Sequence, residues 1–126
     1  MLFRSPDSKP SHCQGAVYSK GQVFIENGVL IKDFQANQGG AVHVAGGMVT
    51  MNGGKIQHCW SRYGGGVYVE SGSFVMNGNA VIGGDNAEEG CLGLNYGGGV
   101  YVKSTGSFAC SSTVLCFERI SFWNSL

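Results

Sequence analysis

The chain has 126 residues, with 8 Lys+Arg against 8 Asp+Glu and a formal net charge of +0 at pH 7. This balance argues against a nucleic-acid-binding protein and against a polybasic membrane-surface protein, because both need clustered positive charge. The 22 glycines, the 2 prolines and the 43% of hydrophobic residues do not fit a disordered or collagen-like chain. We therefore expect one domain of tightly turning β structure.

Residues 1–14 do not follow the pattern of the rest, and we expect an irregular segment there. This stretch contains no apolar region of the kind found in a secretory signal peptide. No run in the chain approaches the ~18 apolar residues of a membrane span, so no transmembrane segment is expected. The alternative for the missing signal is that the natural N-terminus lies upstream of this sequence.

Residues 15–110 form a repeat. Four valines follow glycine-rich turns at separations of 25, 25 and 33 residues: Val17, Val42, Val67 and Val100. A block of alternating apolar residues follows each valine, at 21–25, 47–51, 72–76 and 106–110, and a weaker strand follows at 29–31, 55–56 and 80–82. Period-2 alternation is typical of β-strands. Three short strands per repeat predict an all-β fold, a parallel β-helix (solenoid) of about four coils of ~25 residues.

Stacked coils would align equivalent side chains in inward ladders about 4.8 Å apart. The four valines form one predicted ladder, and the two others are Val23, Val49, Phe74, Phe108 and Ile25, Met51, Met76, Cys110. The Gly-Gly pairs before the valines predict sharp corners with positive φ. At the second corner we expect Asn27, Asn52 and Asn77 to adopt the left-handed conformation and to hydrogen-bond along the stack.

The last spacing, 33 residues, contains eight more residues than the others, and we place them in an insertion loop at 85–96. This loop is the one locally acidic region, with Asp85, Glu88 and Glu89. Insertions in repeat proteins often bind partners, although a tolerated surface insertion is the alternative. Residues 111–126 leave the repeat and are either a cap, with the apolar stretch 121–124 folded over an open end, or debris of truncation or of a shifted reading frame.

Two motifs resemble a known family. The segment 34–37, Phe-Gln-Ala-Asn, followed by Gly-Gly-Ala-Val at 39–42, resembles the paired FxxN and GGA(I/L/V) motifs of the chlamydial polymorphic membrane protein repeats. The Gly-Gly-Gly-Val-Tyr-Val blocks resemble surface β-helix repeats of spirochaete and gut-bacterial proteins. Residues 60–63 and 85–88 occupy the places of FxxN in later copies. The resemblance covers roughly 15–110. It implies a right-handed β-helix, an adhesin or autotransporter-passenger role, and a location at the cell surface or secreted.

If the four valines point inward, the residues that follow them point outward as one stacked row: Tyr18, His43, Tyr68 and Tyr101. Exposed aromatic rows suit the stacking of sugar rings and contacts with proteins. The alternative is that these side chains stabilise one another across strands. Together with Asp85, Glu88 and Glu89, this row is the candidate binding surface.

No catalytic, metal or cofactor site is expected. The five cysteines contain no CxxC pair, and the three histidines, at 12, 43 and 58, have no spacing that would gather them around a metal. Cys59 and Cys110 fall on apolar ladder positions, where we expect small buried hydrophobic side chains. The acids Glu26, Asp33 and Glu70 lie in different coils and do not form a pair for acid–base catalysis.

The sequence thus predicts a non-catalytic surface or adhesin-type β-helix module, as a fragment of a larger surface protein. Its expected partners are host or neighbouring surface proteins or glycans, and its open ends also predict end-to-end self-association. The alternatives are a carbohydrate-binding or carbohydrate-cleaving β-helix fragment, of the polysaccharide-lyase kind, and a degenerate gene remnant.

Overall fold

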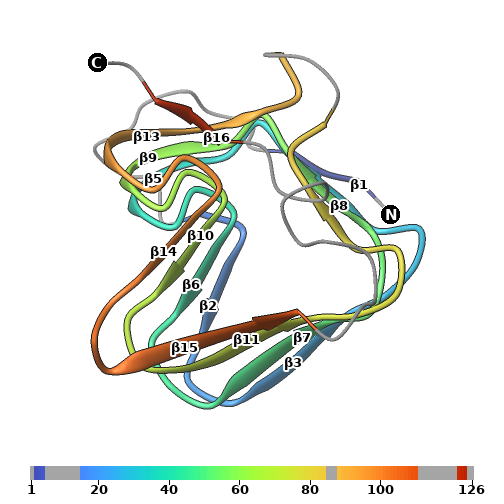
Figure 1. Cartoon of the computed structure of the whole chain (residues 1–126). Coiled ribbons are helices and arrows are strands. Elements are labelled where there is room, and N and C mark those ends of the chain that lie inside the picture. The colour runs from blue at the N-terminus through green and yellow to red at the C-terminus, as the bar shows by residue number, and fades with distance from the viewer. Residues whose placement is uncertain (1, 5–14, 85–87, 111–121, 125–126) are drawn as a thin grey trace.

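The computed structural model describes residues 2–4, 15–84, 88–110 and 122–124, and within them every regular element is a β-strand (Figure 1). The all-β expectation is therefore confirmed for this part of the chain. In chain order the strands are β1 (Leu2–Arg4), β2 (Val17–Ser19), β3 (Gln22–Ile25), β4 (Leu30–Lys32), β5 (Gln35–Gln38), β6 (Val42–Val44), β7 (Met48–Met51), β8 (Lys55–Gln57), β9 (Trp60–Tyr63), β10 (Val67–Val69), β11 (Gly72–Met76), β12 (Val81–Ile82), β13 (Cys91–Tyr96), β14 (Val100–Val102), β15 (Gly106–Cys110) and β16 (Phe122–Asn124).

The strands form four parallel sheets of four strands each. Their orders are β1-β4-β8-β12 (sheet A), β5-β9-β13-β16 (sheet B), β2-β6-β10-β14 (sheet C) and β3-β7-β11-β15 (sheet D). Neighbours in a sheet come from successive repeats, and Figure 1 shows the four sheets as sides around a common interior. The sequence predicted three strands per repeat. Sheet B is the additional one, and its strands β5, β9 and β13 follow β4, β8 and β12 of sheet A along the chain.

All three predicted ladders are present. The first runs Val17, Val42, Val67, Val100; the second Val23, Val49, Phe74, Phe108; the third Ile25, Met51, Met76, Cys110. The inner members are fully buried, and the core also takes in Ile31, Ile56 and Ile82 from the third predicted strand. Alternation along the strands of sheets A, C and D therefore places apolar rows in a shared core, to which sheet B contributes Cys91.

The corner before each valine confirms the prediction of positive φ at the glycine pairs. Gly39, Gly64 and Gly97 have φ values of 67°, 64° and 62°, a region that L side chains rarely adopt. They occupy equivalent places, because the N–H of Gly39 donates to Tyr63 O and that of Gly64 donates to Tyr96 O, both at 3.0 Å. The chain therefore turns in the same way at the ends of β5, β9 and β13.

The prediction for the second corner is wrong in the backbone conformation of all three asparagines and in the hydrogen bonding of Asn27. Asn77 Nδ2 donates to Asn52 Oδ1 at 2.8 Å, but Asn52 Nδ2 donates to Glu26 Oε1 at 3.0 Å. Glu26 therefore takes the ladder position assigned to Asn27, because Ile25 pairs with Met51 at a spacing of 26 residues rather than 25. None of the three asparagines has positive φ, which falls instead on glycines of this corner.

The extra residues of the long spacing are distributed over three places instead of one loop. The paired residues are 25 apart at Met51 and Met76, 26 at Ile56 and Ile82, 32 at Trp60 and Leu92, and 33 at Tyr63 and Tyr96. One residue thus enters before Ile82, six enter between Ile82 and Leu92, and one more enters in β13. The expectation of a loop from 85 to 96 is wrong for 91–96, which is strand β13, and β13 rather than 85–88 aligns with β9.

Both tails contribute a strand to the sheets. β1 pairs in parallel with β4, so residues 2–4 are not irregular, and β16 pairs in parallel with β13. β16 includes part of the stretch for which a cap was expected. The rest of 1–14 and 111–126 lies outside the described residues.

Candidate binding surface

The predicted outward row exists, but it is not an exposed row. Tyr18, His43, Tyr68 and Tyr101 pair in register across β2, β6, β10 and β14. They alternate with the inward valines and so lie on the outer side of sheet C. Only 8% of the surface of His43 and 3% of that of Tyr68 is exposed, whereas Tyr18 is 55% exposed. The inner members are therefore covered by their neighbours, as the alternative of mutual stabilisation requires.

His43 packs between two tyrosines and binds a carboxylate. Its ring lies edge-on to those of Tyr18 and Tyr68, with centroids 4.9 Å away in both cases and interplanar angles of 78° and 82°. Its Nε2 lies 2.8 Å from Oε1 of Glu70, one repeat later. The imidazole of His43 and the carboxylate of Glu70 are thus partners of each other, and their contact links two neighbouring repeats.

A second group of tyrosines adds to this row at the junction of sheets B and C. Tyr63 and Tyr96 are stacked at the ends of β9 and β13, with centroids 5.9 Å apart and an interplanar angle of 22°. The centroid of Tyr101 lies 5.7 Å from Tyr63 and 6.0 Å from Tyr96, and it stacks on Tyr68 at 5.5 Å. We call Tyr63, Tyr68, Tyr96 and Tyr101 the tyrosine cluster.

The backbone explains why these rings meet. Positive φ at Gly64 and Gly97 turns the chain directly after Tyr63 and Tyr96, which brings the next strand back beside them. The register of β13 shifts between Gly93 and Tyr96, and a bulge of this kind re-aims the side chains that follow it. The sequence analysis missed Tyr63 and Tyr96, although both stand directly before a Gly-Gly-Gly-Val-Tyr-Val block.

Exposure within the tyrosine cluster is uneven. Tyr96 is 60% exposed, Tyr63 and Tyr101 are half-buried, and burial raises the pKa of the Tyr68 phenol, with a smaller contribution from the charge of Glu70. Tyr68 is thus the buried member of the cluster, on which the ring of Tyr101 stacks. Tyr63, Tyr96 and Tyr101 form the part that an approaching molecule can touch.

The two acidic residues of the predicted surface that the structure describes, Glu88 and Glu89, do not join the tyrosine cluster. Asp85 lies outside the described residues, Glu88 is exposed and Glu89 is half-buried. The carbonyl of Glu89 accepts a hydrogen bond from the N–H of His58 at 3.1 Å, which places it at the junction of sheets A and B. This junction lies before the first residues of β9 and β13, whereas Tyr63 and Tyr96 are the last residues of those strands.

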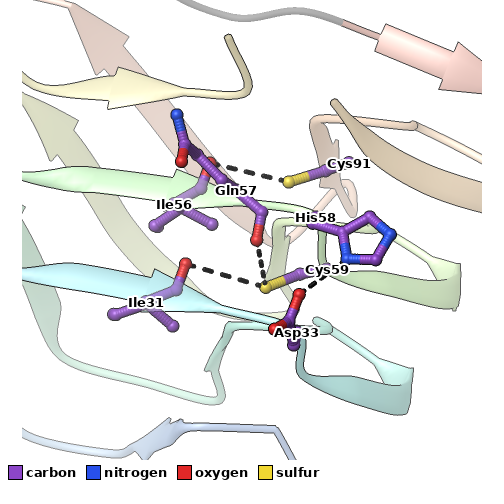
Figure 2. A network of polar contacts seen from close by, with 7 residues as sticks. All are labelled: Ile31, Asp33, Ile56, Gln57, His58, Cys59 and Cys91. Carbon is purple, nitrogen blue, oxygen red and sulfur yellow. Dashed lines mark hydrogen bonds and ion pairs between the residues drawn. The ribbon is translucent and has the colours of Figure 1, made fainter. Parts of the chain in front are cut away.

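The junction of sheets A and B holds a histidine–carboxylate pair (Figure 2). His58 Nδ1 lies 2.6 Å from Oδ1 of Asp33, and both residues have positive φ, 50° and 67°. The next residue, Cys59, turns inward: its Sγ donates to Gln57 O at 3.2 Å and lies 3.9 Å from Ile31 O. The buried thiol and the exposed imidazole therefore lie on different sides of the backbone.

The two buried thiols lie close to backbone carbonyl oxygens of neighbouring strands. Cys59 and Cys91 are free, fully buried and adjacent in the stack, and Cys91 Sγ lies 3.7 Å from Ile56 O (Figure 2). The hydrogen bond with Cys91 and burial together raise the pKa of Cys59, so its reactive thiolate is disfavoured. The expectation of a small buried side chain is confirmed for Cys59, but Cys110 is disulfide-bonded.

Within the described residues, no three His, Cys, Asp or Glu side chains lie close enough to hold a metal ion. No helix in the same part of the chain is long and apolar enough to cross a membrane. No protein-family model, no curated protein and no solved structure matches the chain.

Proposed function

We propose that the chain is a right-handed parallel β-helix of about four coils that acts as a non-catalytic, adhesin-type module of a surface protein. In-register parallel pairing of four sheets from successive repeats supports the architecture. The shared apolar core, with members from every sheet, supports it as well. The resemblance of the two repeat motifs supports the surface location and the handedness.

The exposed part of the tyrosine cluster is the observation that carries the binding role. Tyrosine supplies a large, rigid contact area with a polar edge, and it loses little conformational entropy on binding. Three such rings meet at one corner, and the outermost, Tyr96, is 60% exposed. A surface that only had to stay in water would not need this group.

The positions of the carboxylates support a role without catalysis. Glu26 binds Asn52, Asp33 binds His58 and Glu70 binds His43, each time between neighbouring repeats. These three pairs lie at different corners, so the acids do not face one another as a glycosidase pair would. Their role in this proposal is to hold neighbouring repeats together.

Binding to cultured epithelial cells tests the adhesin role. We expect the purified chain to bind, and Tyr96→Ser to weaken binding about tenfold or more, as expected for loss of an aromatic anchor. Phe24→Ser is the matched control, because Phe24 is 59% exposed on sheet D, away from the cluster. Absence of binding by the unmodified chain, or equal losses in both variants, would contradict the proposal.

Carbohydrate binding is the second candidate, because flat exposed tyrosine rings also suit sugar faces. Treatment of the cells separates the two. Protease treatment removes the binding if the partner is a surface protein, as we propose. Loss after periodate oxidation, together with binding to a printed oligosaccharide array, identifies the carbohydrate-binding alternative.

A further inference from the structure

Among the described strands, sheets C and D have open edges at both ends of the stack. β2 and β3 are outermost at one end, and β14 and β15 are outermost at the other. An open edge presents unpaired backbone N–H and C=O groups and is a template for another strand. All pairings between the described strands are parallel, so a second copy in the same orientation offers the matching edge.

Some side chains at these edges are exposed although the equivalent side chains of inner strands are buried. Val102 is 37% exposed, whereas its in-register neighbour Val69 is fully buried. At the opposite end, the ring of Tyr18 is far more exposed than that of Tyr68 in the same row. Among the described strands, the end strands thus have a neighbour on one side, whereas the inner ones have a neighbour on both.

We propose that copies of this chain associate head to tail, with β2 and β3 of one copy pairing in parallel on β14 and β15 of the next. Each row of side chains then continues into the next copy with side chains of similar character. Val17 stacks on Val100, Tyr18 on Tyr101 and Val23 on Phe108. The chain makes equivalent contacts inside itself, where Val67 pairs with Val100 and Phe74 with Phe108. The partner is therefore a second copy of this chain.

Sheet A fits the same displacement. It also has four strands, so a shift of four strand spacings, about 19 Å, places β1 of one copy beside β12 of the other. A head-to-tail contact of this kind leaves a free edge at each end and adds further copies.

One charge contact in this arrangement is unfavourable, so the proposal predicts that reversing either charge tightens the association. The residues directly after the strands of sheet C are Lys20, Ala45, Glu70 and Lys103. Lys103 follows β14 in the place that Glu70 has after β10, because its N–H donates to Val69 O as that of Glu70 donates to Val44 O. Head-to-tail pairing places Lys103 of one copy beside Lys20 of the next, and both are exposed.

Sedimentation velocity over a range of concentrations tests the association. We expect the mass of the unmodified chain to rise past that of a dimer. Lys103→Glu should tighten association about two- to fivefold, because it replaces a repulsion by an exposed ion pair with Lys20. Lys20→Glu should do the same, and the double variant should return toward the unmodified chain. Lys55→Glu is the control, since Lys55 is exposed on the inner strand β8 and should leave association unchanged.

Val102→Pro tests the edge itself. The N–H of Lys103 points to β10, so that of Val102 points to the open side, and its removal breaks no hydrogen bond between the strands that the structure describes. We expect this variant to keep its circular dichroism spectrum and to stay monomeric. A chain that is monomeric at all concentrations, a dimer that does not extend, or a Lys103→Glu variant without tighter association overturns the proposal.

Discussion

Gly40 lies against Gly65 so closely that a Cβ atom on Gly40 would stand 2.1 Å from the carbonyl oxygen of Gly65. Gly65 in turn has the carbonyl of Gly98 at 2.4 Å from an equivalent Cβ position. These glycines follow one another through the stack at the corner before each inward valine. The glycine pairs are therefore needed both for positive φ and for the close approach of one repeat to the next.

Gly40→Ala should consequently destabilise the fold, because backbone rather than a movable side chain occupies the space. We expect a loss of about 1–3 kcal/mol in the free energy of unfolding, the usual range for overpacking. Gly21→Ala is the matched control: nothing lies within 4 Å of its Cβ position, and a change within about 0.5 kcal/mol is expected. Urea denaturation of both variants measures the difference, and equal midpoints would show that the corner can relax.

The ladders could be predicted from the sequence because they depend on local alternation and on a repeat spacing, both of which are visible in it. The tyrosine cluster could not, because it depends on the bulge in β13 that brings Tyr96 opposite Tyr63. The assignment of Asn27 failed for a related reason. The connection between β2 and β3 is one residue shorter than that between β6 and β7, so Glu26 takes the place that regular counting gives to Asn27.

The exposure of the aromatic row could not be predicted from the sequence pattern either. Alternation places His43 and Tyr68 on the outer side of sheet C, but it does not say what covers that side. The edge-on packing of the His43 ring and the turn that folds Tyr63 beside Tyr101 supply the cover. Alternation in a strand thus predicts the burial of inward side chains better than it predicts the exposure of outward ones.

Val67→Asp should unfold the stack. Val67 is fully buried in the valine ladder, between Val42 and Val100, and a carboxylate there has no partner. Val75→Asp is the matched control, since Val75 is half-buried and alternates with the inward Phe74 and Met76. We expect loss of the cooperative β melt in circular dichroism for Val67→Asp and a smaller loss for the control. Unchanged melting of Val67→Asp would contradict the direction assigned to this strand.

Removal of residues 84–89 should preserve the fold. This deletion takes out the six residues that enter between Ile82 and Leu92, and it joins Gly83 to Gly90 so that β13 keeps its pairing with β9. Deletion of 86–93 has a similar length but removes half of β13, so we expect it to unfold. Far-UV circular dichroism and thermal melting compare the two. A folded 86–93 deletion would show that β13 is dispensable, and an unfolded 84–89 deletion would show that the insertion is structural.

Alkaline pH should weaken the fold through Cys59. The hydrogen bond with Cys91 and burial hold the pKa of Cys59 above its ordinary value. A group whose folded pKa is raised stabilises the fold fully below its unfolded pKa, about 8.5 for a thiol, and loses this contribution as the pH rises through the folded value. The same hydrogen bond lowers the pKa of Cys91, so the two coupled thiols are removed together in the comparison. Because burial disfavours both thiolates, the free energy of unfolding of the unmodified chain should fall more steeply above about pH 8.5 than that of Cys59→Ala/Cys91→Ala. Urea denaturation from neutral to alkaline pH measures both slopes. The double variant starts from a lower stability because of the cavities it leaves, so the comparison rests on the slopes, and parallel slopes would show that the thiol pair does not titrate between the two states.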